Sequence, residues 1–255
     1  MRATGTFGSI ERLYLKPARG KPMQAVGAGE SVACVAGYGL LGDVHASRLS
    51  PRQVLVTLAG ELDALRIAPG ALLENIVIAC AEAALFQPGA AIVTASGVEI
   101  RLTMFCEPCQ RIAAVGHELS TLLRRRGVLG VIETGGALRS GERIELIADK
   151  YPALPESPYQ KFLEFLPTVP PGRVVRYRDI TIAIGAADSF VRALPGYIKR
   201  SGGIGLPLHR IVNARGELLP LLPLQGVQLR AEGVQLLGDH AAVDLTRYLW
   251  NGSAA

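Results

Sequence analysis

Cysteine is scarce in this sequence, where only four of the 255 residues carry a thiol. Four cysteines in so long a chain do not make a disulfide framework, so we expect a cytoplasmic protein whose thiols are free, catalytic or metal-binding. The chain also lacks a run of about 18 apolar residues, so no membrane contact through a span is expected. Its first residues lack the apolar segment of a signal peptide.

Strong charge of either sign is missing as well. Charged residues make up 19% of the chain and the net charge is +5, which permits binding of nucleic acid or an acidic cofactor without indicating either. Each half of the chain is only weakly positive, so any nucleic-acid surface must be local. Hydrophobic residues, at 49%, are ample for a core, and the length suits one large or two small domains.

The N-terminal part, residues 1–149, is expected to hold many short strands between Gly and Pro turns. Strands are predicted at 5–15, 23–26, 30–35, 52–57, 74–78, 92–94 and 98–105, with two more in 127–147. Helices are predicted at 59–65 and 112–126, and the second ends in Arg124–Arg126 and Gly127, which are typical of a solvated helix C-terminus. This pattern predicts a β-barrel-like domain.

A proline-rich linker is predicted at residues 150–158, where the composition changes. The following part, residues 159–255, is expected to be helical at 159–166, 177–184, 189–200 and 243–249. Helix, short turn, helix is the helix-turn-helix pattern. The sequence therefore predicts an α+β chain of two domains, a mostly β barrel followed by a small helical domain of the winged helix-turn-helix type.

Two of the four cysteines stand together in the segment Cys106-Glu107-Pro108-Cys109, directly after a predicted strand. A thiol pair at this spacing can carry sulfur, bind a metal, form a disulfide or simply pack. A zinc site is disfavoured because no second such pair exists, and Cys34 and Cys80 lie alone in apolar strands, where core packing is expected. We therefore take Cys109 first and Cys106 second as the catalytic or metal-binding thiols.

A glycine-rich segment from Gly37 to His45 is the second candidate site. Its glycines let the backbone approach a phosphate or a pterin edge, and Asp43 and His45 stand at its end. The alternative for His45 is a structural role in the loop. Arginines at positions 52, 101 and 111 are candidates for holding a phosphate group.

The first domain resembles the MOSC family, the domain found at the C-terminus of molybdenum-cofactor sulfurases, over about residues 5–148. The resemblance rests on six ordered motifs: Gly39-Leu40-Leu41-Gly42-Asp43-Val44-His45, Arg52-Gln53-Val54, Pro69-Gly70 with Glu74-Asn75-Ile76, Cys106-Glu107-Pro108-Cys109, Arg126-Gly127, and Gly135-Gly136 before Ser140-Gly141-Glu142.

What this resemblance implies is a mostly β domain that binds a molybdenum cofactor, a molybdopterin, or handles sulfur for it. A cysteine would be the metal ligand or the sulfur carrier. Pyridoxal phosphate binding is implied as well. The cofactor-binding residues expected from the matched motifs and the arginines are Gly39, Gly42, Asp43, His45, Arg52, Asn75 and Arg101.

The second domain resembles the DNA-binding domain of O6-alkylguanine-DNA alkyltransferases over about residues 157–237. The matching segments are Tyr159-Gln160-Lys161-Phe162, residues 169–180, residues 191–194, residues 206–212 and residues 231–234. The family's active site reads Pro-Cys-His-Arg-Val, and here Leu208 stands at the cysteine. An isobutyl side chain cannot accept an alkyl group, so this domain is closer to the alkyltransferase-like proteins, which bind lesions without repairing them.

The resemblance implies DNA as a partner, specifically DNA that contains a modified guanine. The residues expected to contact DNA are Tyr177, Arg192, Lys199, Arg200 and Arg210. Three departures from the family weaken the match. Pro195 is expected to kink the recognition helix, Ser201 replaces an asparagine, and the apolar run 218–224 replaces a polar loop.

Three functions are compatible with these features. The first is a thiol-dependent protein that handles the molybdenum cofactor or sulfur and has a recognition domain without alkyltransferase activity. The second is a DNA-binding protein of the alkyltransferase-like type without enzymatic activity. The third is a sulfur carrier or docking protein with no role on DNA. Partners of the first would include a sulfur donor or an electron-transfer protein.

Overall fold

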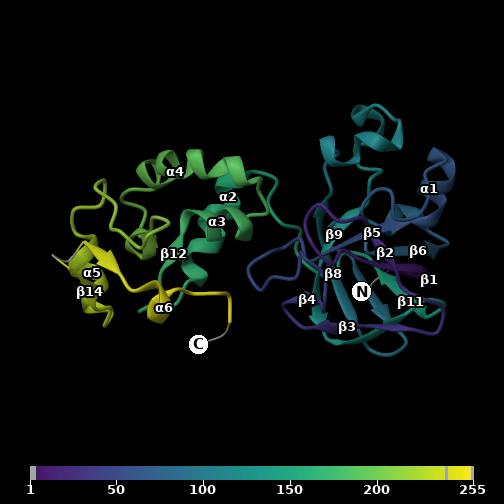
Figure 1. The fold of residues 1–255 in the computed structure, drawn as a ribbon, viewed down its shortest axis with the longest axis horizontal. Helices are drawn as coiled ribbons and strands as arrows, with labels where there is room; N and C mark the ends of the chain where they lie inside the picture. Colours follow the sequence, from purple (N-terminus) through teal and green to yellow (C-terminus); the bar gives the residue numbers. More distant parts are fainter. Residues whose placement is uncertain (1–3, 239–240, 254–255) are drawn as a thin grey trace. The chain divides into compact units, whose positions relative to one another are not determined.

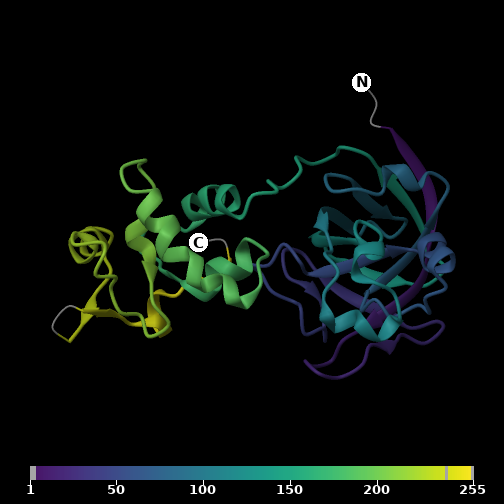
Figure 2. The same ribbon diagram turned by 90° about the horizontal axis from the view of Figure 1, so that it is seen from above.

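The protein is described by a computed structural model that covers residues 4–238 and 241–253. The chain divides into two compact units, residues 1–154 and 155–255. The ribbon views in Figures 1 and 2 show the first unit as mostly strands and the second as mostly short helices. The chain is therefore an α+β protein of two domains, as the sequence predicts. No helix of the described residues is both long enough and apolar enough to span a bilayer.

The first unit is a closed barrel built from one sheet. Its ring runs through β1 (Gly5–Leu15), β6 (Ile76–Cys80), β5 (Val54–Leu58), β9 (Val128–Thr134), β8 (Glu99–Phe105), β7 (Ala91–Thr94) and β11 (Arg143–Ile147), which pairs with β1 again. Neighbours in the ring are antiparallel except β5 and β6. The short strand β2 (Gln24–Ala25) pairs with β1 outside the ring.

A smaller sheet adds to the barrel. It consists of β10 (Gly136–Arg139), β3 (Ser31–Val35) and β4 (Gly39–Leu40). Side chains alternate along β3, so that Val32 and Cys34 are buried while their neighbours are not. These two residues join the barrel core, whose largest buried side chains come from β1, β4, β6, β7 and β8.

The strands predicted from the sequence are confirmed, with shifted ends, and residues 127–147 hold three strands where two were predicted. Helix α1 (Ala59–Leu65) is confirmed too. The single helix predicted at 112–126 is wrong. The structure has two short 3-10 turns there, η2 (Gln110–Val115) and η3 (Leu119–Leu122). Gly116 separates them at a φ of 76°, and Arg124 has a φ of 59°, so an α-helix cannot continue through either residue.

The first half of the predicted linker is attached to the barrel. The Tyr151 N–H donates to the Gly89 carbonyl at 2.9 Å, and Arg101 Nη2 donates to the Pro152 carbonyl at 2.9 Å. The Tyr151 hydroxyl donates to Glu99, which also pairs with Lys150. The boundary between the units therefore falls at Leu154, inside the predicted linker.

The second unit packs short helices around a second core. Its elements up to the middle are α2 (Pro158–Phe165), η4 (Leu166–Thr168), β12 (Val175–Arg176), α3 (Tyr177–Ala183), η5 (Asp188–Ala193) and α4 (Leu194–Arg200). They are followed by η6 (Leu208–Arg210), β13 (Ile211–Val212), α5 (Gln225–Ala231), β14 (Leu236–Leu237), β15 (Ala242–Val243) and α6 (Leu245–Tyr248). Phe162 lies at the centre of this core and is fully buried.

The predicted helix 189–200 is divided between η5 and α4. Pro195 is the second residue of α4, in the first turn, where a missing N–H breaks no helical hydrogen bond. The expected kink inside a recognition helix is therefore wrong. The helix predicted at 243–249 is shorter than expected, because Ala242 and Val243 pair with Leu236 and Leu237 in a hairpin.

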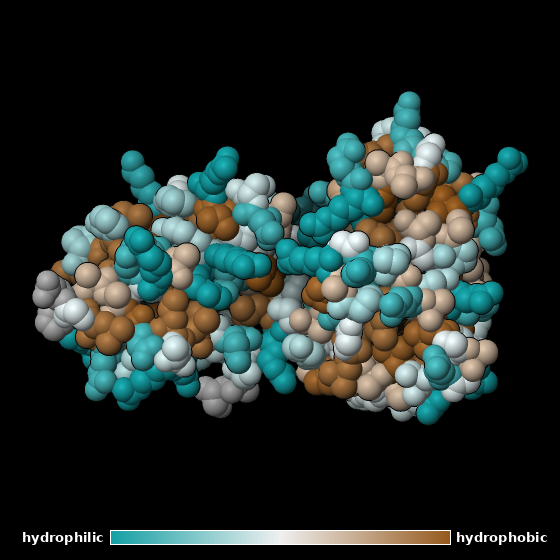
Figure 3. All heavy atoms as spheres, in the orientation of Figure 1, coloured by the Kyte–Doolittle hydropathy of each residue, from teal (hydrophilic) through white to brown (hydrophobic). Residues whose placement is uncertain are grey.

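The surface in Figure 3 is a mosaic of polar and apolar patches. Two exposed leucines belong to the apolar run 218–224, since Leu221 is 43% exposed and Leu224 is 65% exposed. Leu219 of the same run is buried. The run therefore packs into the unit only in part.

Closure of the barrel leaves no room at Gly8, which lies on β1 between β6 and β11. A Cβ on Gly8 would lie 2.0 Å from the Ala79 carbonyl oxygen. We expect Gly8→Ala to lower the free energy of unfolding of the barrel by about 3 kcal/mol, because backbone must shift. The matched control is Gly60→Ala in α1, whose Cβ meets nothing. Urea denaturation measures both, and equal stability of the two variants would contradict the account.

Candidate functional site

The buried member of the thiol pair is Cys106, which follows the last residue of β8. Its N–H donates to the Gly127 carbonyl at 2.9 Å, and its side chain packs with Leu55 and Leu129 at 2% exposure. Burial raises the pKa of the Cys106 thiol, and the nearby charges of Arg126 and Arg52 do not overcome this effect. Cys106 is therefore a neutral thiol in the wall of the site.

Cys109 is the accessible member of the pair. It lies immediately before η2, is half-buried, and has Arg126 Nη1 at 3.5 Å from its sulfur. Burial alone would raise its pKa, but the N–H of Arg111 and the charge of Arg126 outweigh burial and lower the pKa of the Cys109 thiol. The structure thus gives the two cysteines opposite characters, with the more reactive thiolate at Cys109.

Arg126 is the residue that sequence reasoning missed. It was expected on a solvated helix end, yet it is 5% exposed. Its Nη1 donates to the Glu107 carbonyl at 2.6 Å as well as to Cys109, and its Nη2 donates to the Leu72 carbonyl at 3.4 Å. Its Nε has no hydrogen-bond partner within the described part of the chain. The one signal for it in the sequence is the Arg126-Gly127 motif.

Glu74 lies fully buried near the same guanidinium. Its Oε1 accepts the Gly70 N–H, whereas its Oε2 has no hydrogen-bond partner among the residues described. Burial raises the pKa of Glu74, with the Arg126 charge acting in the opposite direction. Among the residues described, a carboxyl group and a guanidinium, each with one unpartnered polar atom, therefore lie near each other, and the guanidinium contacts Cys109.

Asp43 is hydrogen-bonded to two other predicted cofactor residues, His45 and Asn75. Its Oδ2 accepts from Asn75 Nδ2 at 2.7 Å and from the Lys16 N–H at 2.8 Å, and its Oδ1 accepts from the N–H and Nδ1 of His45 at 2.8 and 2.9 Å. Burial opposes ionisation, but these bonds lower the pKa of Asp43. The network fixes the glycine-rich loop against β1 and β6.

Asn75 carries this network toward the thiols. Its Oδ1 accepts the Leu55 N–H at 3.0 Å, and Leu55 packs on Cys106. Gly39 has a φ of 119° and Gly42 a φ of 85°, so both need the freedom of glycine in the loop. Asp43, His45 and Asn75 are thus occupied with one another, and they position the loop.

The structure places the three predicted arginines at different sites. Arg52 lies beside Cys106, whose ionisation it favours. Arg101 is elsewhere, with its guanidinium over the Tyr151 ring at 5.2 Å and hydrogen-bonded to the Pro152 carbonyl. The structure therefore brings Arg52 to the thiols and does not bring Arg101 to them. Arg111 is exposed at the start of η2 and donates its backbone N–H to Cys109.

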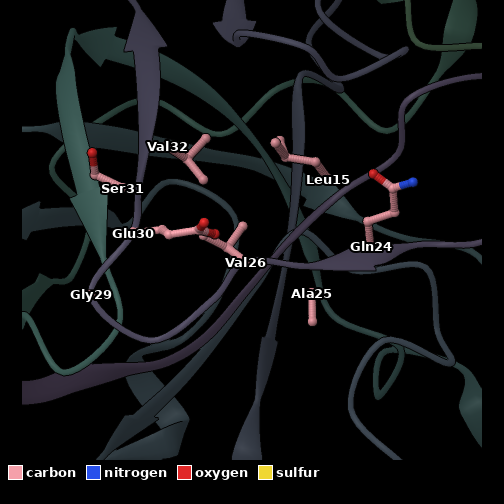
Figure 4. Close-up of a pocket in the computed structure, with 8 residues that line it drawn as sticks. All are labelled: Leu15, Gln24, Ala25, Val26, Gly29, Glu30, Ser31 and Val32. Atoms are coloured by element: carbon pink, nitrogen blue, oxygen red, sulfur yellow. The ribbon is translucent and has the colours of Figure 1, made fainter.

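Two cavities of the barrel are lined by other residues. The cavity in Figure 4, of about 540 Å³, is lined by residues of β1, β2, β3 and the turn between β2 and β3, including Gln24, Glu30 and Ser31. A second cavity lies beside α1 and includes Cys80 in its lining. Within residues 4–238 and 241–253 no group of three or more His, Cys, Asp and Glu side chains is arranged to hold a metal ion.

In the second unit, Leu208 begins η6 and belongs to the core cluster at 8% exposure. The neighbouring His209 and Arg210 both point to Glu232. Its carboxylate accepts from His209 Nε2 at 2.8 Å, from Arg210 Nη2 at 2.6 Å and from the Gly172 N–H at 2.9 Å. Burial opposes ionisation, yet these donors lower the pKa of Glu232 to about 2. Arg210, expected on DNA, is thus committed to this carboxylate.

The other residues expected on DNA are differently placed. Arg192 lies at the end of η5, is exposed, and has no hydrogen-bond or ion-pair partner in the described chain. Tyr177 begins α3 and is partly buried, which raises its pKa. Lys199 and Arg200 form the last turn of α4, and the Arg200 guanidinium lies 4.0 Å from the centre of the Tyr159 ring.

The apolar run 218–224 is fixed at its end by the buried Gln225. Its Oε1 accepts the Leu219 N–H at 2.6 Å, and its Nε2 donates to the carbonyls of His209 and Ile211 at 3.0 and 2.6 Å. Ser201 is also buried and shares a hydrogen bond with the Tyr159 hydroxyl at 3.0 Å. The segments around Leu208 are therefore held together by side-chain hydrogen bonds.

Comparison with known proteins shows which family the second unit matches. Residues 157–234 match the family model of the 6-O-methylguanine DNA methyltransferase DNA-binding domain. A DNA base-flipping protein of Escherichia coli (strain K12) is 35% identical over 96 residues, which are 36% of this chain and 73% of that protein. This chain belongs to the methylguanine methyltransferase DNA-binding family. Its membership rests on the second unit, and the barrel lies outside the matched residues.

Three solved structures are similar to parts of this methyltransferase-family chain. The YUAD protein from Bacillus subtilis is 17% identical, with 57% of this chain and 98% of that chain covered and a TM-score of 0.49. YiiM from Escherichia coli is 16% identical, with 78% and 94% covered and a TM-score of 0.42. S. pombe Atl1 in complex with damaged DNA containing O6-carboxymethylguanine is 24% identical, with 38% and 97% covered and a TM-score of 0.35.

Because the two thiols differ in pKa and exposure, we expect iodoacetamide to alkylate Cys109 faster than Cys106. Because its pKa is lowered, Cys109 holds its thiolate at lower pH than an ordinary cysteine, so its rate should rise below the usual midpoint of about 8.5. In Arg126→Gln the pKa of Cys109 should rise, making the reaction at neutral pH several-fold slower. Arg125→Gln, on the half-buried neighbour that pairs with Glu61, is the matched control.

Mass spectrometry of the alkylated peptides across a pH series makes this measurement. Cys34 should stay unmodified in the folded protein, because burial raises its pKa to about 12. An unchanged pH midpoint for Cys109 in Arg126→Gln would contradict the role given to the guanidinium.

Proposed function

We propose that the second unit binds DNA containing a modified guanine and does not transfer the alkyl group to itself. The observation that carries this proposal is Leu208, which stands where the methyltransferases have their acceptor cysteine. Alkyl transfer needs a thiolate at that atom, and a leucine offers only saturated carbon. In the described chain the second unit has no thiol that could replace it, because all four cysteines belong to the barrel.

The free guanidinium of Arg192 supports contact with DNA. An exposed arginine without an intramolecular partner can enter the minor groove at no cost in broken ion pairs. Lys199 and Arg200 lie in the last turn of the next helix, α4, and would supply phosphate contacts. Arg210 has no part in this interface, because its guanidinium is held inside the unit by the Glu232 carboxylate and the Val169 carbonyl.

Recognition of the modified base requires it to leave the helical stack. A base inside a duplex is inaccessible to a pocket, so proteins that read a single base extrude it. The name of the Escherichia coli relative, a DNA base-flipping protein, supports the same step here. We assign to Arg192 the place left by the extruded guanine, with Tyr177 beside the backbone phosphate.

Fluorescence anisotropy with labelled duplexes tests this function. The protein should bind a duplex with one O6-methylguanine more tightly than the same duplex with guanine, and Arg192→Ala should weaken the binding about tenfold. The matched control is Arg215→Ala, which removes the same charge from an exposed turn where the guanidinium already pairs with Glu217. Equal affinity of both duplexes, or equal loss in both variants, would exclude the proposal.

We further propose a thiol site in the barrel that binds a molybdenum cofactor or carries sulfur for it. The contact between Arg126 and Cys109 favours this second function, because a stabilised thiolate is both a soft metal ligand and a sulfur nucleophile. The residues present fit such a group. Cys109 would bind the soft centre, Arg52 and Arg111 would face anionic oxygens, and the glycine loop would admit a pterin edge.

In this site Asp43, His45 and Asn75 act as positioning residues for the loop. The bound cofactor would supply redox chemistry, and the chain would supply its orientation and a wall that excludes water. A sulfur donor or an electron-transfer protein would be the partner of this site. Pyridoxal phosphate stays a prediction of the family resemblance.

Elemental analysis and intact-mass spectrometry of the purified protein test the thiol site. We expect molybdenum bound to the protein, or an added sulfur atom on Cys109, and expect either to be lost in Cys109→Ser. Cys80→Ser is the matched control, because Cys80 lies on β6 away from the pair. Neither molybdenum nor added sulfur in wild type would exclude this function without touching the DNA-binding proposal.

A further inference from the structure

Positive charge in the barrel unit is concentrated in two segments of the chain. Residues 13–29 and 44–60 contain five of the 16 Lys and Arg residues of positions 1–150 and none of the 14 Asp and Glu residues of those positions. Outside the two segments these positions hold 11 Lys and Arg against the same 14 acids. A unit with almost no net charge therefore combines a basic region with an acidic remainder.

The two basic segments are hydrogen-bonded to each other, although β2, β3 and β4 separate them in the chain. The Val44 N–H donates to the Lys16 carbonyl at 2.8 Å, and the Lys16 N–H donates to Asp43 Oδ2 at 2.8 Å. The Lys21 N–H donates to the Ala18 carbonyl at 3.3 Å and closes a turn within the first segment. These bonds join the first segment to the loop that begins at Asp43, so their charges form one region.

Three basic side chains of this region are accessible to a partner. Lys21 and Arg48 are exposed, and Lys16 is half-buried. The Arg48 guanidinium lies 5.7 Å from the centre of the Tyr38 ring, and none of the three side chains forms an ion pair within residues 4–238 and 241–253. We call Lys16, Lys21 and Arg48 together the basic surface.

The acids that flank the two segments in the chain do not neutralise this surface. They are Glu11, Glu30, Asp43 and Glu61. Each of these carboxylates accepts a hydrogen bond from a group other than the three basic side chains. Three unpaired cations close to one another attract an anion that presents several charges in a row.

The chain itself indicates DNA as that anion, because the unit that follows belongs to a DNA-binding family. Tyr151 and Pro152 are hydrogen-bonded to the barrel, and α2 begins at Pro158. Only about five residues therefore join the units, and they span at most about 18 Å. DNA held by the second unit is thus offered to the barrel at a high effective concentration, so that even weak contacts add to the affinity.

We propose that the basic surface of the barrel binds the phosphate backbone of the DNA that the second unit holds. The proposal rests on the DNA binding proposed above for the second unit. Lysine and arginine contacts to phosphate carry no sequence information, so the barrel contributes affinity while the second unit reads the base. The contact uses neither the thiols nor a cofactor.

Fluorescence anisotropy of the full chain on two duplexes measures this contact. Both duplexes carry one central O6-methylguanine. The short one has about 10 base pairs, roughly the 34 Å that a unit of this size covers, and the long one has about 30 base pairs. The triple variant Lys16→Gln, Lys21→Gln and Arg48→Gln should bind the long duplex at least tenfold more weakly than wild type. Its affinity for the short duplex should equal that of wild type.

The salt dependence of binding to the long duplex is the second readout. Each lost phosphate contact lowers the slope of log affinity against log salt by about 0.9, so the triple variant should lose about 2.7 of the slope. The matched control removes three exposed charges outside the two segments, by Arg66→Gln, Arg139→Gln and Arg143→Gln. This control should keep the affinity and the slope of wild type.

Equal losses in the two triple variants, equal losses on the two duplexes, or no loss on the long duplex would overturn the proposal. A basic-surface variant that keeps its affinity for DNA but loses bound molybdenum would assign the surface to the phosphate of the cofactor and would overturn it as well. Failure of the second unit is distinguishable. Wild type would then show no preference for O6-methylguanine over guanine, whereas a loss confined to the basic-surface variant on the long duplex would still support the barrel contact.

Discussion

The buried guanidinium of Arg126 is the constraint on which the thiol site depends. A charge taken out of water is costly unless donors and acceptors meet it, and this one is met by the carbonyls of Glu107 and Leu72 and by the Cys109 sulfur. These partners come from the segment between the two cysteines and from the segment before β6, while Gly127 joins the arginine directly to β9. Satisfying one charge thus holds the segment that carries both thiols. The same charge separates Cys109, which it favours as a thiolate, from Cys106, where burial prevails.

A carboxylate has the corresponding role in the second unit. Glu232 gathers His209, Arg210 and the Gly172 backbone, and so holds the segment that carries Leu208. This arrangement keeps the frame of a methyltransferase domain although the acceptor thiol is absent. It also decides which arginine remains available, because Arg210 is bound inside the unit whereas Arg192 is exposed. The two units therefore divide the chemistry, with the thiols in the barrel and the proposed lesion-binding surface in the helical unit.

Local patterns predicted most of the strands and helices, because alternation and Gly or Pro turns act over a few residues. The helix predicted at 112–126 was wrong, because the apolar spacing gives no sign of the positive φ that Gly116 and Arg124 adopt. The thiol pair and the leucine in place of the acceptor cysteine were visible in the sequence. The motifs that contain Arg126 and Glu74 were visible too, but the burial of these two side chains was not, because it depends on barrel closure, which brings together residues far apart in the chain. Arg101 lies on β8, the strand that ends just before Cys106, but its side chain donates to the Pro152 carbonyl of the linker and not to the thiols.

The central claim is that this member of the methyltransferase family recognises DNA without performing the family's transfer. The most direct measurement is the intact mass of the protein after prolonged incubation with a duplex containing O6-methylguanine, made on a sample in which the bound duplex is recovered and digested to nucleosides. The account predicts an unchanged protein mass and an intact O6-methylguanine in the recovered DNA. A methyl group on any residue of the protein, with guanine restored in the duplex, would contradict it.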